Sequence, residues 1–251
     1  MPREMSEDGK QSLLTHLLEL RQRLIKCVIA IAVASVIAFI FYEWIFYILK
    51  LPAEELNLIF IEMTEMLGTI MRVCLIAGII LAMPYLVFQG IMFVSPALTS
   101  REKKYVYVIL PWIALMFMGG VTFGYFVLIP PATRFLLSFG ADIASPEIRV
   151  GNYIAVIARL LLAIGIAFEM PVITTFLARL GVLKPHWLSD HRRTAIIVAF
   201  ILAAIITPTF DPINQSLVAV PLIILYEMSI WLARLVYKQP PIEAASDVIA
   251  Q

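Results

Sequence analysis

The chain has 251 residues, of which 61% are hydrophobic and 15% are charged, and its formal net charge is +1. Soluble globular domains are closer to half apolar and a quarter charged, so this composition favours several membrane spans over soluble domains. The balanced charge provides no basic field that would favour nucleic acid. The two cysteines, Cys27 and Cys74, lie in apolar runs, so the sequence indicates no disulfide framework.

The N-terminal segment, residues 1–23, is polar and charged. It is too long and too acidic for the first region of a signal peptide. Four leucines recur at helical spacing and form one stripe: Leu13, Leu17, Leu20 and Leu24. Glu19 and Arg23 have the spacing and order of a favourable ion pair on a helix. The segment is therefore either an interfacial amphipathic helix that leads into a span or a docking surface with an available carboxylate.

Six apolar runs are predicted to cross a membrane as helices. About 20 apolar residues suffice for one crossing, and five runs meet or approach that length: residues 24–47, 67–94, 106–130, 154–177 and 217–236. The remaining run, 195–206, would cover roughly 18 Å of a hydrocarbon core that is roughly 30 Å thick. It is either a re-entrant or interfacial helix or a short span. Basic residues on its N-terminal side alone favour a crossing.

The basic residues predict the orientation of these spans. Most of the 19 Lys and Arg residues fall on the side that holds both termini. The opposite side carries Lys50, Arg72, Arg134 and Arg149, and Arg159 lies within the fourth span. Because cytoplasmic loops of membrane proteins are enriched in basic residues, both termini are predicted to lie in the cytoplasm.

One carboxylate interrupts an apolar run, in the stretch IGIAFEMPVI at residues 164–173. Glu169 would lie roughly 14 Å deep in the membrane, where an ionisable group normally faces a cavity or a partner. Pro171 removes a backbone donor and bends the helix. Glu169 is therefore either a neutral, hydrogen-bonded group that fixes helix packing or part of a polar recess in the bundle.

A short basic loop follows the second span. In SPALTSREKK, residues 95–104, Glu102 is the only acid. It is either neutralised by its basic neighbours or available to accept an arginine of a partner in bidentate geometry.

A second polar stretch, TPTFDPINQS at residues 207–216, follows the short run. Its Asn214, Gln215 and Ser216 are suited to helix capping and turn formation. If the fifth span is short, we expect the sixth to be short as well, with Glu227 at the cytoplasmic surface.

Motifs for catalysis are missing from the sequence. It contains no GxxxxGK[ST] loop, no HExxH motif and no Cys/His cluster with metal-ligand spacing. An intramembrane serine protease would need a base at the depth of its nucleophile, and the three histidines fall at the cytoplasmic side. We therefore expect no catalytic residue, no metal site and no cofactor.

Five motifs in order, HLLELRQRL, FVSPALTSREKK, FEMP, TPTFD…NQ and PLIILYE, resemble the TatC family of the twin-arginine protein translocase. The resemblance covers residues 16–234. It implies an all-α integral membrane protein of the bacterial cytoplasmic (inner) membrane, with six helices in a concave bundle, short last two helices and cytoplasmic termini. We accordingly divide the chain into a cytoplasmic amphipathic segment (1–23), a transmembrane domain (24–236) and a cytoplasmic tail (237–251) that is expected to be disordered.

The resemblance also implies a function. Proteins of this family bind twin-arginine signal peptides of folded cargo and assemble with single-span partners of the TatA and TatB type, and the proton-motive force drives export. It further implies copies of the chain together in the complex and no nucleic-acid partner.

The resemblance assigns candidate site residues. It implies a signal-peptide site at Glu19, Arg21, Arg23, Phe93, Ser95, Pro96, Leu98 and Glu102, with Glu102 as the leading contact for the two arginines. It implies an intramembrane or partner-binding set at Glu169, Asp211, Asn214, Gln215 and Glu227. The family often reads TPPD or TPTPD, whereas here Phe210 precedes the acid.

Two other functions stay open at this point. A proton-coupled secondary transporter would use Glu169 and would take up small substrates with this chain alone. A purely structural scaffold would tolerate the loss of Glu102. A translocase core would instead co-purify with single-span partners.

Overall fold

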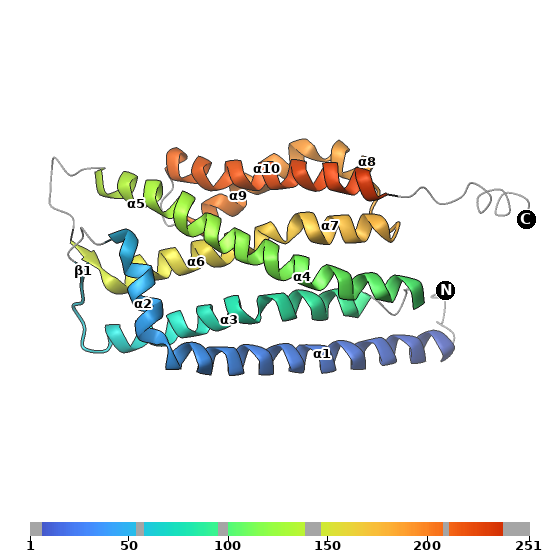
Figure 1. The fold of residues 1–251 in the computed structure, drawn as a ribbon, viewed down its shortest axis with the longest axis horizontal. Helices are drawn as coiled ribbons and strands as arrows, with labels where there is room; N and C mark the ends of the chain where they lie inside the picture. The colour runs from blue at the N-terminus through green and yellow to red at the C-terminus, as the bar shows by residue number, and fades with distance from the viewer. Residues whose placement is uncertain (1–6, 54–57, 95–99, 139–146, 208–210, 238–251) are drawn as a thin grey trace, which may run out of the picture.

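The protein is a bundle of long α-helices in a computed structural model (Figure 1). The structure describes residues 7–53, 58–94, 100–138, 147–207 and 211–237. Within these residues, five segments are long and apolar enough to cross a membrane: His16–Ile40, Glu65–Phe93, Val108–Leu136, Val150–Arg179 and Pro212–Val236. They confirm the predicted all-α membrane protein. The count of six spans and the side of each terminus stay predictions.

The first helix, α1 (Glu7–Ile40), joins the amphipathic segment and the first span in one continuous element. The prediction that this span reaches residue 47 is wrong, because the chain leaves helical geometry at Phe41 and α2 (Tyr42–Lys50) crosses the end of the bundle (Figure 1). Composition does not reveal this break, because α2 is also apolar, with Phe46 and Leu49 buried, and so looks like a continuation of the span.

The segments after α2 and before α6 pair with each other. A short 3₁₀ turn, η1 (Leu51–Ala53), precedes strand β1 (Leu58–Ile59), which pairs in parallel with β2 (Ile148–Arg149). The register sets Leu58 opposite Ile148. This ladder is too short to produce a periodic pattern, so the sequence did not predict it.

Helix α3 (Glu65–Val94) lies directly against α1. A glycine permits the close approach: a Cβ on Gly78 would lie 2.6 Å from the backbone nitrogen of Ser35 and 2.7 Å from its Cα. The α1–α3 pair therefore depends on a position without a side chain.

The third span is interrupted but does not end where it was predicted to end. Helix α4 (Ser100–Phe123) passes through a π-helical turn, η3 (Gly124–Leu128), into α5 (Ile129–Ser138). The predicted end at residue 130 is wrong, because the chain stays helical through the π turn and past Pro130 and Pro131 to Ser138. Tyr125, in the π turn, donates to the backbone oxygen of Ile48 at 2.7 Å and so connects this turn to α2.

The fourth span is the centre of the bundle (Figure 1). It consists of α6 (Val150–Phe168) and α7 (Met170–Arg179), with the break at Glu169. Two glycines admit aromatic rings across the α4–α6 contact: Phe117 packs at Gly165, and Phe168 packs at Gly120. Much of the main hydrophobic core lies on α6.

The C-terminal part contains α8 (Pro185–Asp190), α9 (Arg192–Ile206) and α10 (Pro212–Val236). The predicted shortness holds for α9, whose 15 residues span roughly 22 Å. It is wrong for α10, which is a 25-residue helix. The helix continues past Glu227 because Ile230 and Ala233 pack against α7 and α8. That α9 crosses the membrane stays a prediction.

Candidate functional site

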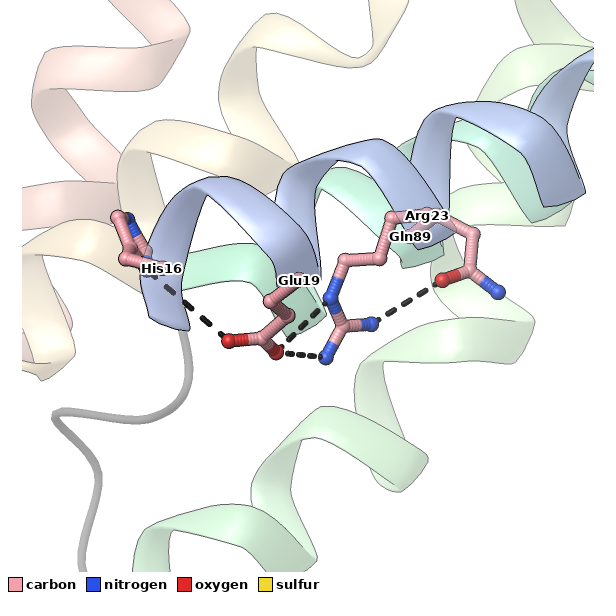
Figure 2. A network of polar contacts seen from close by, with 4 residues as sticks. All are labelled: His16, Glu19, Arg23 and Gln89. Atoms are coloured by element: carbon pink, nitrogen blue, oxygen red, sulfur yellow. Dashed lines mark hydrogen bonds and ion pairs between the residues drawn. The ribbon is translucent and has the colours of Figure 1, made fainter. Parts of the chain in front are cut away.

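Predicted site residues gather at the end of the bundle where α1 begins and α3 ends (Figure 2). Arg23 of α1 donates to Glu19 Oε1 twice, from Nη2 at 2.6 Å and from Nε at 3.1 Å. The two residues are one helical turn apart, as the sequence predicted. The side chains are only 19% and 30% exposed, so this ion pair is better sheltered than an ordinary surface pair.

The second helix completes the cluster. Gln89 of α3 is buried, and its Oε1 accepts a hydrogen bond from Arg23 Nη1 at 3.1 Å. The guanidinium is thus held between a carboxylate on α1 and an amide on α3, as Figure 2 shows. His16 stacks on the ring of Phe93 with centroids 4.3 Å apart, and its Nδ1 lies 4.0 Å from Glu19 Oε2.

This arrangement is suited to binding arginine. A carboxylate and an amide oxygen are the acceptors that a planar guanidinium bridges well. Glu19 Oε1 accepts from Arg23, and within the described residues the one approach to Oε2 is that of His16 Nδ1 at 4.0 Å. Among these residues, Oε2 is therefore the oxygen of Glu19 that can accept from a second cation.

The other residues assigned to the signal-peptide site are placed less fully. Arg21 is exposed on α1. Ser95, Pro96 and Leu98 lie outside the described residues. The backbone of Glu102 is in the first turn of α4, and its side chain lies outside the described part.

Glu169 occupies the break between α6 and α7. Its side chain is 1% exposed, and neither carboxyl oxygen has a hydrogen-bond partner among the described residues. The backbone continues through the break, since Glu169 N–H donates to Ile166 and its oxygen accepts from Ile173. Glu169 therefore faces the interior and not lipid, and its carboxyl group lies in an apolar setting.

The predicted residues at the start of α10 stabilise local structure. Asp211 caps the helix: its Oδ1 accepts from the backbone N–H of Asn214 at 2.6 Å, and its Oδ2 accepts from the Asn214 side chain at 3.0 Å. Gln215 Nε2 donates to the backbone oxygen of Phe200 at 2.9 Å and so joins α10 to α9. The predicted capping does occur here, but the capping side chain is Asp211, with Asn214 as its partner, whereas Gln215 bonds to the neighbouring helix.

The other end of this helix pair is joined as well. Glu227 forms an ion pair with Arg192 at 2.9 Å, at the first residue of α9. Tyr226 donates its hydroxyl to the backbone oxygen of Leu188 in α8. These two contacts join α10 to the beginning of α9 and to α8.

Two residues of the α1–α3 cluster were not assigned from the sequence. Gln89 is a single amide in the apolar run AMPYLVFQGIMFV, and that isolation was the available signal. His16 is the first residue of the HLLELRQRL motif, and the sequence does not predict that its ring stacks on Phe93. Elsewhere in the described part of the chain, no group of three or more His, Cys, Asp or Glu side chains is placed to hold a metal ion.

Comparisons with known proteins agree on one family. A family model described as "Sec-independent protein translocase protein (TatC)" matches residues 15–221. The TatC protein of Carboxydothermus hydrogenoformans is 41% identical over 232 residues, covering 92% of this chain and 96% of its own length. That of Aquifex aeolicus is 41% identical over 226 residues, covering 88% and 93%.

Solved structures agree with these sequences. A crystal structure described as the twin-arginine translocase receptor TatC is 40% identical, with a TM-score of 0.80, and the match covers 88% of this chain and 99% of that one. A second, described as the same receptor in the detergent DDM, is 41% identical, also with a TM-score of 0.80, covering 87% and 99%. The chain is thus a multi-pass membrane protein and belongs to the TatC family of Sec-independent protein translocase components.

Proposed function

We propose that this chain is the core receptor subunit of a twin-arginine translocase and that it binds the signal peptides of folded proteins at the α1–α3 end of the bundle. The observation that carries the proposal is the guanidinium of Arg23, which is held between Glu19 and Gln89. This end of the bundle already contains the acceptors that arginine recognition requires.

The proposed contacts divide between two acids. Glu102, the one acid in its basic loop, binds a signal arginine in bidentate geometry. Glu19 contributes through Oε2 and binds less strongly, because Arg23 already neutralises much of its charge. Phe93, with the stacked His16, offers an apolar and aromatic surface beside Glu19. Arg21, Ser95, Pro96 and Leu98 complete the proposed site.

Assembly and energy supply extend the proposal. The chain acts in the cytoplasmic (inner) membrane of a bacterium with both termini in the cytoplasm, together with TatA- and TatB-type single-span partners and further copies of itself. The proton-motive force drives export. Glu169, the start of α10 with Asp211, Asn214 and Gln215, and Glu227 farther along α10 lie near the partner helices. The role is binding and assembly, without catalysis or a cofactor.

The test is crosslinking of a twin-arginine peptide to the full chain in detergent. Glu102→Gln removes the charge and keeps the shape, so we expect crosslinking to be lost while the protein stays monodisperse. Glu19→Gln should weaken it less. Glu147→Gln, at an exposed acid elsewhere, is the matched control and should leave it unchanged. Unchanged crosslinking in Glu102→Gln would sink the proposed site.

The orientation has a separate test. Single cysteines at Ser189, in α8, and at Thr209, just after α9, should react with an impermeant thiol reagent from opposite sides of the membrane. Labelling from the same side would remove α9 from the spans and leave the termini on opposite sides.

A further inference from the structure

A basic pocket lies between α8 and the end of α10, at the same end of the bundle as the start of α1 (Figure 1). Its volume is about 400 Å³, and its lining consists of Lys184, Pro185, His186, Arg234 and Tyr237. The described lining brings together Lys184 and Arg234, which are far apart in the sequence, and includes no acid. None of these residues belongs to the sites assigned above.

Contacts between α8 and α10 hold the walls of the basic pocket in place. Arg234 Nη2 donates to Ser189 Oγ at 2.6 Å, and the Tyr226 hydroxyl donates to the backbone oxygen of Leu188 at 2.7 Å. Leu188 also packs with Ala233 of α10 in one buried cluster. The guanidinium of Arg234 is therefore oriented before a ligand arrives, which lowers the entropy cost of binding.

The two cations of the basic pocket are available to an anion. Among the described residues, neither Lys184 nor Arg234 forms an ion pair with an acid. Asp190, one turn beyond the start of α8, lies 2.7 Å from His186 Nδ1 and so pairs with the third basic group. Within the same part of the chain, Arg234 Nη1 and Nε make no hydrogen bond. A guanidinium with free donors beside an ammonium is suited to phosphate.

The basic pocket lies at the level of a membrane interface. Arg234 is 22 residues beyond Pro212, the first residue of α10, and therefore about 33 Å along the helix, close to the roughly 30 Å of a hydrocarbon core. Trp231, one helical turn before Arg234, is exposed, as are Leu235 and Val182. Tryptophan is typical of the interface, and exposed apolar side chains there can contact acyl chains.

We propose that the basic pocket binds the phosphate of an anionic phospholipid, with Arg234 and Lys184 as the cationic contacts and an acyl chain along α10 past Trp231. Charge complementarity selects the phosphate, because the described lining holds these cations and no acid. The level of the pocket and the exposed apolar side chains beside it select a lipid over a free anion. The bound lipid bridges α8 and α10 and so steadies the segment between α7 and α9.

The test uses the purified full chain in neutral detergent, stripped of lipid and titrated with phosphatidylglycerol that carries a photoreactive group near the glycerol end of one acyl chain. Labelled peptides are mapped by mass spectrometry, and we expect label on residues 182–187 and 228–237. In Arg234→Gln the lipid concentration for half-maximal label should rise about tenfold or more, because a charge-assisted contact is lost. Arg193→Gln, at an exposed arginine of α9 outside the pocket, is the control and should behave as the wild type.

A second variant keeps the test decisive if Arg234→Gln does not fold. Lys184 is exposed and makes no hydrogen bond or ion pair with a described residue, so Lys184→Gln should leave the fold intact. It should raise the half-maximal lipid concentration about fivefold, as expected for one basic side chain near a membrane surface.

Two further arms separate the sources of binding. A photoreactive diacylglycerol with the same chains lacks the phosphate and should not label residues 182–187 or 228–237 at these concentrations. Inorganic phosphate at millimolar concentration should not displace the lipid, because it has no chain to contact the apolar side chains.

Four results would overturn the proposal. One is an unchanged half-maximal lipid concentration in Lys184→Gln and in folded Arg234→Gln. Another is equal labelling by diacylglycerol and phosphatidylglycerol. The third is displacement of the lipid by inorganic phosphate, which would make the pocket a site for free anions. The fourth is a polypeptide that crosslinks to Lys184 in native membranes and resists excess phosphatidylglycerol, which would make the pocket a protein contact.

Discussion

Glu19 and Glu169 are two carboxyl groups of one chain in opposite settings. Glu19 is at the end of the bundle, 30% exposed, and its Oε1 accepts two contacts from Arg23. Glu169 is at the centre, 1% exposed, and lacks a hydrogen-bond partner among the described residues. Their helices differ in the same way, since α1 is the least buried of the five candidate spans and α6–α7 the most buried.

The comparison indicates what each position permits. An acid that is partly exposed and partly neutralised can bind and release a further guanidinium at small cost, which suits reversible peptide binding. An acid without a partner in the interior keeps a charge only at high cost, so it changes state when a partner, water or a proton reaches it. In the proposed function, peptide binding accordingly takes place at the α1–α3 end, and Glu169 acts in a later step.

The largest effect is expected from Glu169→Lys. The longer cation would be placed in a buried, apolar setting, and we expect a loss of folding stability of about 3 kcal/mol or more. Accumulation in membranes and monodispersity after detergent extraction measure it. Glu43→Lys, at an exposed position of α2, is the control and should accumulate normally. Normal accumulation of Glu169→Lys would mean that Glu169 is reachable by water.

The second-largest effect is expected from Gly78→Ala, which tests the packing of α1 against α3 on which the contacts around Glu19 depend. Gly78→Ala places a Cβ against the backbone of Ser35 and should cost about 1–3 kcal/mol by separating α1 from α3. It should also weaken peptide binding, because the contact between Arg23 and Gln89 spans the same two helices. Gly68→Ala on the same helix meets no atom within 4 Å and serves as the control. Thermal unfolding in detergent compares the two variants. Equal stability of Gly78→Ala and Gly68→Ala would argue against the close contact between Gly78 and Ser35.

Glu169→Gln tests function apart from folding. The amide keeps the size and removes the ionisable group, so we expect stability within about 1 kcal/mol of the wild type and unchanged peptide crosslinking. Export of a folded twin-arginine reporter should nevertheless fall several-fold. Full export would contradict a role in partner recruitment or proton coupling, whereas lost peptide binding would contradict the separation of the two carboxyl groups.

Arg23→Gln tests how far the ion pair with Arg23 limits Glu19 as an acceptor for a signal arginine. Without the internal guanidinium, both oxygens of Glu19 become available to a signal arginine. We expect tighter peptide binding by several-fold, in line with the about 1 kcal/mol of a partly exposed ion pair. Fluorescence anisotropy with a labelled twin-arginine peptide measures it, with Arg72→Gln, at an exposed position of α3 outside the proposed site, as the control. Weaker binding in Arg23→Gln would instead mean that Arg23 positions the site.

The smallest effect is expected at Glu227. Its ion pair with Arg192 joins two side chains that are 41% and 45% exposed. Glu227→Gln should therefore change stability by less than about 1 kcal/mol. If Glu227→Gln lowered the melting temperature as much as Gly78→Ala, the Glu227–Arg192 ion pair would stabilise the fold more than is usual for exposed side chains.

The apolar runs determined most of the architecture from the sequence alone. Length and hydropathy suffice to find a span, because each helix in a membrane must satisfy its own backbone hydrogen bonds. The family motifs likewise indicated the α1–α3 end before any contact was known. The spacing of Glu19 and Arg23 predicted their pairing, since residues four apart meet on any helix.

Only the tertiary structure decided where apolar helices break and which residues meet across them. The turn at Phe41 and the passage through Pro130 depend on what α2 and α5 pack against, which composition does not record. Gln89 joined the site because Gly78 lets α3 approach α1. Packing alone leaves the carboxyl group of Glu169 without a hydrogen-bond partner among the described residues. A sequence shows that a polar group is present, but its surroundings come from segments far away along the chain.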